Sequence, residues 1–284
     1  MTAWGIFIYA WDWEPSIVLG CAAMMVAYLV ATRFRLKRTT GIFALGVLMM
    51  LVALVSPIDV LGDSYLFSAH MLQHLILILI VPPLLIVGTP RWMVHMGLRW
   101  RPLRRAEQTL SRPLTAWLAG VLTLWVWHLP VLYNAALANE DIHIFEHLCF
   151  LVSASIFWWP VLAPVEDLRL PPLFAAAYVF AGCVADTLLA IVITFAPVGL
   201  YPAYLHPVDT LGILPLLRGQ WGLTAAVDQQ VGGLLMWVPS CFVYLTIILS
   251  IFVRWYQAPE ADEFAIRQGR RSPLPALSHP RSGV

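Results

Sequence analysis

The stretch from Tyr65 to Gly88 constrains the fold more than any other, because none of its 24 residues carries a formal charge. As a helix that rises about 1.5 Å per residue, it would reach roughly 36 Å, enough to cross a bilayer with some tilt. The rest of the chain is similar in character, since 60% of its 284 residues are hydrophobic and only 12% are charged. That composition is too apolar for a soluble domain of this length. We therefore predict an all-α integral membrane protein.

Seven apolar runs are long enough to be predicted as transmembrane helices. They are Pro15–Thr32, Gly41–Pro57, Tyr65–Gly88, Pro113–Leu129, Ile142–Ala163, Pro171–Ala196 and Gln229–Val253. Of the seventeen lysine and arginine residues, all except Arg218 flank these runs on one side. Positively charged flanks usually face the cytoplasm, so the N-terminus is predicted to lie outside and the C-terminus inside.

The chain is expected to have two parts. Residues 1–256 form the seven-helix transmembrane domain, and residues 257–284 form a cytoplasmic tail. The tail is charged at first and then rich in Pro and Ser, which predicts a short helix followed by disorder. Asp12 and Glu14 precede the first apolar run, whereas a cleavable signal peptide starts with positive residues. We expect this first run to stay in the membrane.

Charge and motifs exclude several classes of function. The net charge of +1 leaves no basic face once the arginines are assigned to loops, which argues against a nucleic-acid partner. A retinal Schiff base needs a lysine within the membrane, but Lys37, the only lysine, lies in a predicted cytoplasmic loop. The four cysteines show no CxxC spacing. No Walker loop, paired-carboxylate cleft or catalytic triad is recognisable, so we do not expect an enzyme.

Histidines gather near the predicted outer ends of three helices. His70 and His74 are four residues apart, and so are His143 and His147, which places each pair on one helix face. His128 ends the fourth apolar run. A metal site between helices needs one or two ligands from each of several helices, and this pattern supplies them. Any one of these histidines could instead hydrogen-bond to a neighbouring helix or to interfacial water, but their convergence favours a metal.

Two aspartates near the same leaflet have open roles. Asp186 lies in the outer half of the sixth run, where an ionisable residue needs a partner. It either orients one of the histidines or forms a hydrogen bond between two helices. Asp228 precedes the last run and is predicted to cap the N-terminus of that helix.

Imidazoles suit copper, zinc and iron, and nearby sulfur would favour Cu(I). Cys21, Met24, Met25 and Met71 are the nearest candidates, although sulfur side chains in membrane helices more often serve packing. Three alternatives stay open at this stage. Histidines on different helices could hold a b-type haem, Asp186 and deeper cysteines could line a metal permease, or every histidine could be structural in a scaffold.

The sequence resembles the multi-pass CtaG family of cytochrome c oxidase assembly factors, which occur in bacterial plasma membranes and differ from the single-span copper chaperone of the same name. The resemblance covers roughly Ser56–Val253. It rests on SPIDVLGD at Ser56–Asp63, FSAHMLQH at Phe67–His74, VPPLLIVGTPRWM at Val81–Met93, WHLPVLYN at Trp127–Asn134, FWWPVL at Phe157–Leu162 and DQQVGGLLMW at Asp228–Trp237. The family implies oxidase subunits as partners and a role in forming the copper centre. It supports His70 more strongly than His74.

The combined prediction is a copper-binding assembly factor that passes Cu(I) to an oxidase subunit. The ion would lie between the outer ends of the third, fourth and fifth helices. His70, His128 and His147 are the main predicted ligands, His74 and His143 come next, and Asp186 orients them.

Overall fold

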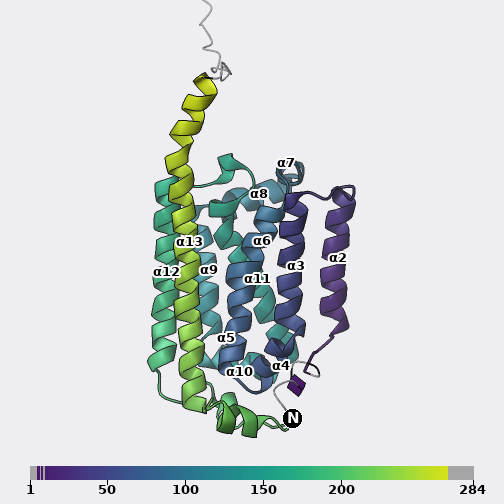
Figure 1. Ribbon diagram of the computed structural model, residues 1–284, viewed down its shortest axis with the longest axis vertical. Coiled ribbons are helices and arrows are strands. Elements are labelled where there is room, and N and C mark those ends of the chain that lie inside the picture. Colours follow the sequence, from purple (N-terminus) through teal and green to yellow (C-terminus); the bar gives the residue numbers. More distant parts are fainter. Residues whose placement is uncertain (1–4, 7, 9, 268–284) are drawn as a thin grey trace, which may run out of the picture.

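A computed structural model describes residues 5, 6, 8 and 10–267 of this protein, with side chains up to Gln257. No strand occurs among these residues, and the helices form an upright bundle (Figure 1). The predicted all-α class is therefore confirmed. The disorder predicted for the tail falls mostly on residues 268–284, which lie outside the described residues.

Five helical segments are long and apolar enough to cross a membrane. They are α3 (Arg38–Val55), the continuous segment Phe67–Gly88, α11 (Glu140–Leu162), α12 (Pro172–Phe195) and the Ala225–Gln257 part of α13 (Ala225–Arg267). A sixth candidate is a broken pair, α9 (Pro113–Trp127) and α10 (Pro130–Ala138), which bend by 71°. The apolar helix α2 (Pro15–Ala31) is shorter, with 17 residues, and stands at the edge of the bundle beside α3 (Figure 1). The count of seven spans and their orientation remain predictions.

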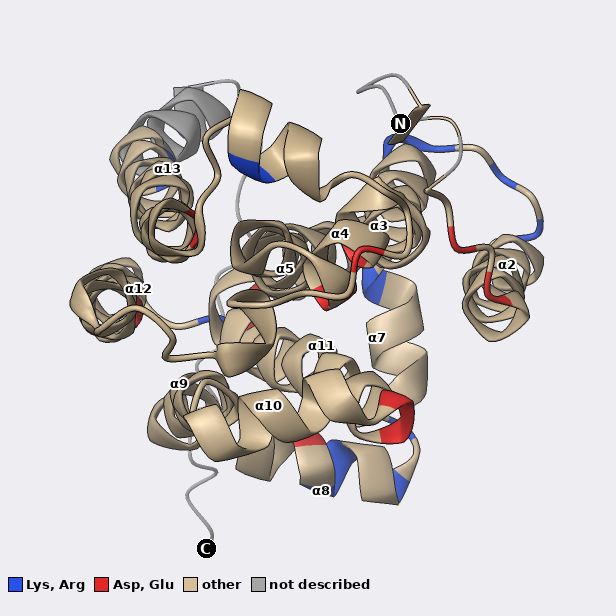
Figure 2. Cartoon of the chain, turned by 90° about the horizontal axis from the view of Figure 1, so that it is seen from below, with Lys and Arg blue, Asp and Glu red and all other residues tan. Residues whose placement is uncertain are grey.

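Short elements cover both ends of the bundle. The end with α4 (Pro57–Ser64) and α10 carries acidic residues on α4 and on the first turn of α11 (Figure 2). The opposite end holds the arginine-bearing helices α7 (Arg91–Gly97) and α8 (Arg101–Leu110) and the basic α2–α3 connection (Figure 1). The η2 turn (Glu166–Leu168) joins α11 to α12, and η3 (Pro202–Tyr204) and η4 (Pro215–Gln220) lie between α12 and α13. Charge is thus separated between the two ends, as expected for a spanning bundle.

Prolines explain the irregular third span. The segment Phe67–Gly88 consists of α5 (Phe67–Leu75), a π-helical turn η1 (Ile76–Ile80) and α6 (Val81–Gly88). Pro82 and Pro83 have no N–H, so neither an α nor a π pattern can supply a donor to the Ile78 carbonyl. The indole N–H of Trp158 on α11 donates to that carbonyl at 3.0 Å. A neighbouring helix therefore restores the hydrogen bond that the prolines remove.

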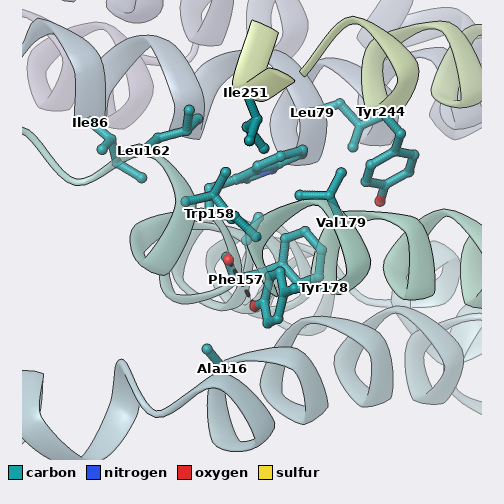
Figure 3. Close-up of a cluster of buried hydrophobic side chains, with 13 residues drawn as sticks. Leu79, Ile86, Ala116, Phe157, Trp158, Leu162, Tyr178, Val179, Tyr244 and Ile251 are labelled. Carbon is teal, nitrogen blue, oxygen red and sulfur yellow. Dashed lines mark hydrogen bonds between the residues drawn. The ribbon is translucent and has the colours of Figure 1, made fainter. Parts of the chain in front are cut away.

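The main apolar core lies toward the α7–α8 end and joins η1, α6, α9, α11, α12 and α13 (Figure 3). Phe157 and Trp158 of α11 pack against Tyr178 of α12 and Tyr244 of α13. Close packing is the main force between helices in lipid, and it favours small residues. Gly182 is one of these, because an added Cβ there would lie only 2.6 Å from the Phe157 ring.

Candidate metal centre

The five predicted histidines meet at the end of the bundle opposite that core. The two intrahelical pairs, His70–His74 on α5 and His143–His147 on α11, each have ring centroids 4.2 Å apart. Between helices, the His70–His143 rings lie 5.3 Å apart and the His74–His147 rings 5.6 Å apart. His128, at the end of α9, has its ring 5.7 Å from that of His74. The structure thus brings all five imidazoles into one cluster, while their role as ligands remains a prediction.

Asp228 of α13 fixes where α5 begins. Its carboxylate accepts hydrogen bonds from the Phe67 N–H at 2.8 Å, the Ser68 N–H at 3.1 Å and the Ser68 hydroxyl at 2.6 Å. A negative charge at free N–H groups of a helix N-terminus is favourable. The prediction that Asp228 caps its own helix was wrong. That helix begins at Ala225, and the Thr224 hydroxyl oxygen accepts from the Val227 N–H at 3.3 Å instead.

Two further contacts set the position of the α5 histidines. The Gln73 amide donates to the Ala53 carbonyl of α3 at 3.1 Å and to the Asp59 carboxyl of α4 at 2.5 Å. At Gly62, α4 approaches α5 so closely that an added Cβ would lie 2.9 Å from the backbone nitrogen of His70. The SPIDVLGD motif therefore packs directly against the backbone of the first histidine.

His128 is oriented by the break between α9 and α10. Pro130 starts α10, and His128 is the last residue before the bend. The His128 Nδ1 lies 2.7 Å from the Leu124 carbonyl oxygen. Because a carbonyl only accepts, Nδ1 carries the proton and Nε2 presents its lone pair. The Tyr201 hydroxyl donates to the His128 carbonyl at 2.8 Å and so satisfies the end of this helix.

Two carboxylates join the cluster. Asp63 at the end of α4 lies 3.6 Å from Nδ1 of His70 and 3.6 Å from Nδ1 of His143. Glu146, which is fully buried, lies 3.9 Å from Nε2 of His74. The candidate list from the sequence missed both residues. Glu146 could have been found from its three-residue spacing to His143, which places both on one helix face. Asp63 could not, because its sequence context is that of a loop residue and only the packing of α4 against α5 brings it to the cluster.

Many donor atoms in the cluster are buried and have no hydrogen-bond partner among the described residues. They are both ring nitrogens of His70 and of His74, Nε2 of His128, His143 and His147, Oδ1 of Asp63 and both carboxylate oxygens of Glu146. Each such atom costs about 1–3 kcal/mol if it stays unpaired. Buried polar atoms are rarely left in this way, so their concentration here fits a site that binds an ion.

Asp186 lies apart from the ligand groups. Its side chain hydrogen-bonds to Ser240 of α13. It shares with His74 and His128 only the lining of a small cavity of about 30 Å³. Of the two roles left open for Asp186, the interhelical hydrogen bond is the one present, and no direct contact links it to a histidine among the contacts described.

Most of the sulfur side chains that suggested Cu(I) lie away from the histidines. Cys21, Met24 and Met25 belong to an apolar cluster that includes residues of α2 and α3, whereas Met71 packs with Phe67 and lines the small cavity beside His74 and His128. Among the described His, Cys, Asp and Glu side chains, the two groups with donor atoms close enough to hold an ion contain only imidazoles and a carboxylate. The donor atoms of these two groups are therefore nitrogen and oxygen.

The connection between α12 and α13 covers the cluster. Tyr201 and Tyr204 stack around Phe67 and Tyr133, and the Tyr204 hydroxyl donates to the Gly62 carbonyl at 2.7 Å. The Arg218 guanidinium fastens this segment by donating to the Tyr204 carbonyl at 2.6 Å. The only basic residue predicted outside therefore has a structural role.

Asp59 lies beside the cluster, outside the spanning segments. Burial, and secondarily the nearby charge of Asp63, raises the pKa of Asp59 to about 8, although the hydrogen bond from Gln73 opposes the shift. Asp59 is therefore largely protonated at neutral pH. Asp63 is therefore the partly exposed carboxylate that faces His70 and His143.

Comparison with known proteins agrees with the motifs. Residues 23–258 match the model of a family described as "Cytochrome c oxidase caa3 assembly factor (Caa3_CtaG)". The chain belongs to this family. The resemblance inferred from the sequence motifs is confirmed, and the matched residues include every helix that contributes to the histidine cluster.

Curated relatives of this Caa3_CtaG member include longer mycobacterial proteins. One is an uncharacterized protein of Mycobacterium leprae, 24% identical over an aligned length of 308 residues, gaps included. The alignment covers 95% of this chain and 45% of the relative. Another, from Mycobacterium bovis, is 22% identical over 311 residues with the same coverage. The chain thus spans less than half the length of these relatives. No solved structure matches it significantly.

Proposed function

We propose that this protein binds copper at the histidine cluster, on the extracytoplasmic side of a bacterial plasma membrane, and supplies it during assembly of a caa3-type cytochrome c oxidase. The observation that carries the proposal is the convergence of five imidazoles from three helices, three of them buried and two partly buried, each with at least one ring nitrogen that has no hydrogen-bond partner among the described residues. Family membership supports the link to oxidase assembly.

The donor set is compatible with copper in more than one oxidation state. Imidazole suits copper, zinc and iron, and carboxylates favour the harder divalent ions. Because Cys21, Met24 and Met25 pack away from the histidines and only Met71 lines the adjoining cavity, the particular argument for Cu(I) is weaker than the sequence suggested. Copper is preferred because a cytochrome c oxidase contains copper centres that must be filled during assembly.

The position of the cluster suits delivery from outside the cell. It lies at the acidic end of the bundle, which the positive-inside rule assigns to the outer face (Figure 2). Exposed acids at this end would raise the local concentration of cations. The aromatic connection over the cluster would restrict access to the side where Asp63 and His143 are partly exposed, so release to a partner subunit would occur there.

Two rival functions fit the geometry less well. A haem needs a wide slot between its axial ligands, but the rings of the cluster are 4–6 Å apart and the adjoining cavity is only about 30 Å³. A permease needs a polar path to the other face. Here the apolar core with Phe157, Trp158 and Tyr244 (Figure 3) lies between the cluster and the α7–α8 end, since Phe157 and Trp158 follow His147 by about three turns along α11.

The decisive experiment is metal analysis of detergent-purified protein after loading with copper and removal of free metal. Wild type should retain copper, and His70→Ala and His147→Ala should each lose most of it. His95→Ala and His206→Ala are matched controls, because both histidines are exposed and lie outside the cluster. Equal copper in all five proteins, or none in wild type, would overturn the proposal. A Soret band in the purified protein would select the haem alternative.

A further inference from the structure

We infer that the cluster contains two adjoining ion subsites joined by His70, an outer one that captures the ion and a deep one that holds it. This inference rests on the proposed function and specifies how the same cluster works. The outer subsite consists of Asp63, His70 and His143, and the deep subsite of His70, His74 and His147.

Distances define the two groups. In each group, the donor atoms all lie within 4.8 Å of one another. Ligands at about 2.0–2.2 Å from a shared ion are at most about 4.4 Å apart, so small side-chain adjustments would close each group around one ion. His70 is the only residue common to both groups, and its two buried ring nitrogens lack partners.

The number of donors argues against a single ion. Five imidazoles and two carboxylates lie within the cluster, whereas zinc takes about four protein ligands and copper with nitrogen ligands a similar number. One ion would therefore leave several buried donor atoms unpaired. Two subsites use the donors more completely, with Glu146 and His128 at the side of the deep one.

Burial differs between the subsites and sets their order. The Asp63 side chain is 35% exposed and that of His143 is 12% exposed, whereas His70 and His74 are almost completely buried. Along α11, His147 lies one turn deeper than His143, a step of about 5–6 Å. An ion from the aqueous side would meet the outer subsite first, and only ligand exchange at His70 would bring it to the deep one.

Charge supports the same direction of movement. Asp63 places a partly exposed carboxylate at the entrance, where it attracts cations from water. Glu146 is fully buried beside His74 and has no hydrogen-bond partner among the described residues. A buried carboxylate is costly unless a cation or donor pairs with it, so an ion in the deep subsite would be stabilised there.

The test measures two pools of bound metal. Protein in detergent is loaded anaerobically with Cu(I), using ascorbate as reductant, and then exposed to the chelator bathocuproine disulfonate. Wild type should release one fraction of its copper quickly, from the outer subsite, and retain a second fraction, from the deep one. Both the size of the retained pool and the rate at which it forms are recorded.

Variants separate the subsites. His143→Asn should remove the fast pool and slow the filling of the retained pool at least tenfold, without changing its final size. His147→Asn should remove the retained pool and leave the fast one, and His70→Asn should lose both. If a His143 variant fails to fold, Asp63→Asn tests the same subsite, and His95→Asn is the control for handling.

Two outcomes would overturn the inference in different ways. If His143→Asn and His147→Asn lose the same pool to the same extent, the cluster is one site, and the proposed copper function still stands. If wild type binds no copper in either pool, the proposed function fails together with the subsites. A retained pool that fills at the wild-type rate in both His143→Asn and Asp63→Asn would remove the outer capture step.

Discussion

The two ends of the helix bundle differ in whether buried polar side chains have hydrogen-bond partners. Near the α7–α8 end, Trp158 donates to the Ile78 carbonyl and the Tyr178 hydroxyl donates to the Phe157 carbonyl, so these two buried side chains of the aromatic core each have a partner on another helix (Figure 3). Near the opposite end, His70 and His74 have none for any ring nitrogen. The segments Phe67–Gly88 and α11 contribute residues to both regions.

This difference indicates that the core was shaped for stability and the cluster for binding. Membrane helices gain stability from packing and from hydrogen bonds between helices, and the core uses both. A set of unpaired donors costs stability in the free protein, and it is expected where a ligand later supplies the missing partners. If the comparison holds, substitutions in the core should lower stability, whereas some substitutions in the cluster should raise it and abolish metal binding.

The largest expected effect is in the core. Trp158→Ala removes a fully buried side chain and leaves the Ile78 carbonyl without its donor, so we expect a loss of about 3–5 kcal/mol. Thermal unfolding in detergent would measure it as a fall in Tm. Phe242→Ala is the matched control, because Phe242 is 65% exposed on the outer surface of α13. Similar Tm values for the two variants would contradict the role given to the core.

The next largest effect is at the link between the two regions. Asp228→Asn removes the charge that three donors of Phe67 and Ser68 share, at an expected cost of about 1–3 kcal/mol. Because these bonds set the start of α5, copper affinity should fall as well, by about tenfold. Asp209→Asn is the comparison variant, since Asp209 accepts from the Ile213 and Leu214 N–H groups in the cover and no hydrogen bond to α5 is described for it. A stability loss with unchanged affinity would show that Asp228 does not position the histidines.

Within the cluster, we expect a smaller effect on stability, and here the substitution should stabilise the protein. His74→Leu replaces an unpaired buried imidazole with an apolar side chain of similar size, so the metal-free protein should gain about 1 kcal/mol. The same variant should hold less copper than wild type after chelation. Tm measured with and without copper checks both points, since copper should raise the Tm of wild type by more than that of the variant. A destabilised metal-free variant would mean that His74 has a structural role.

Helical periodicity made the histidine pairs predictable. Residues four apart must share a face, so His70 with His74 and His143 with His147 could be paired from the sequence alone. The fold class followed from the long uncharged runs for the same reason, because both depend only on local spacing and composition.

Features that depend on how helices rotate and pack were not predictable in this way. Asp63 reaches the cluster because α4 folds back against α5 at Gly62, and Asp228 finds its partners about 160 residues earlier in the chain. Neither of these two contacts between helices produces a periodic pattern in the sequence. Cys21 on α2 likewise belongs to an apolar cluster with Phe43 and Val47 of α3, so the sulfur-based argument for Cu(I) became weaker.

The smallest expected effect concerns pH and lies at the edge of the cluster. Burial raises the pKa of Asp59 from its ordinary value of 3.8 to about 8. Between these values the folded protein holds a proton that the unfolded chain has lost, so this contribution is complete below about pH 4 and disappears as the pH rises through 8. Between pH 6 and 9, the Tm of wild type should therefore fall more steeply than that of Asp59→Asn, which is neutral throughout. Parallel curves for the two proteins would show that Asp59 is ionised in the folded state, and the cluster would then carry an additional negative charge beside Asp63.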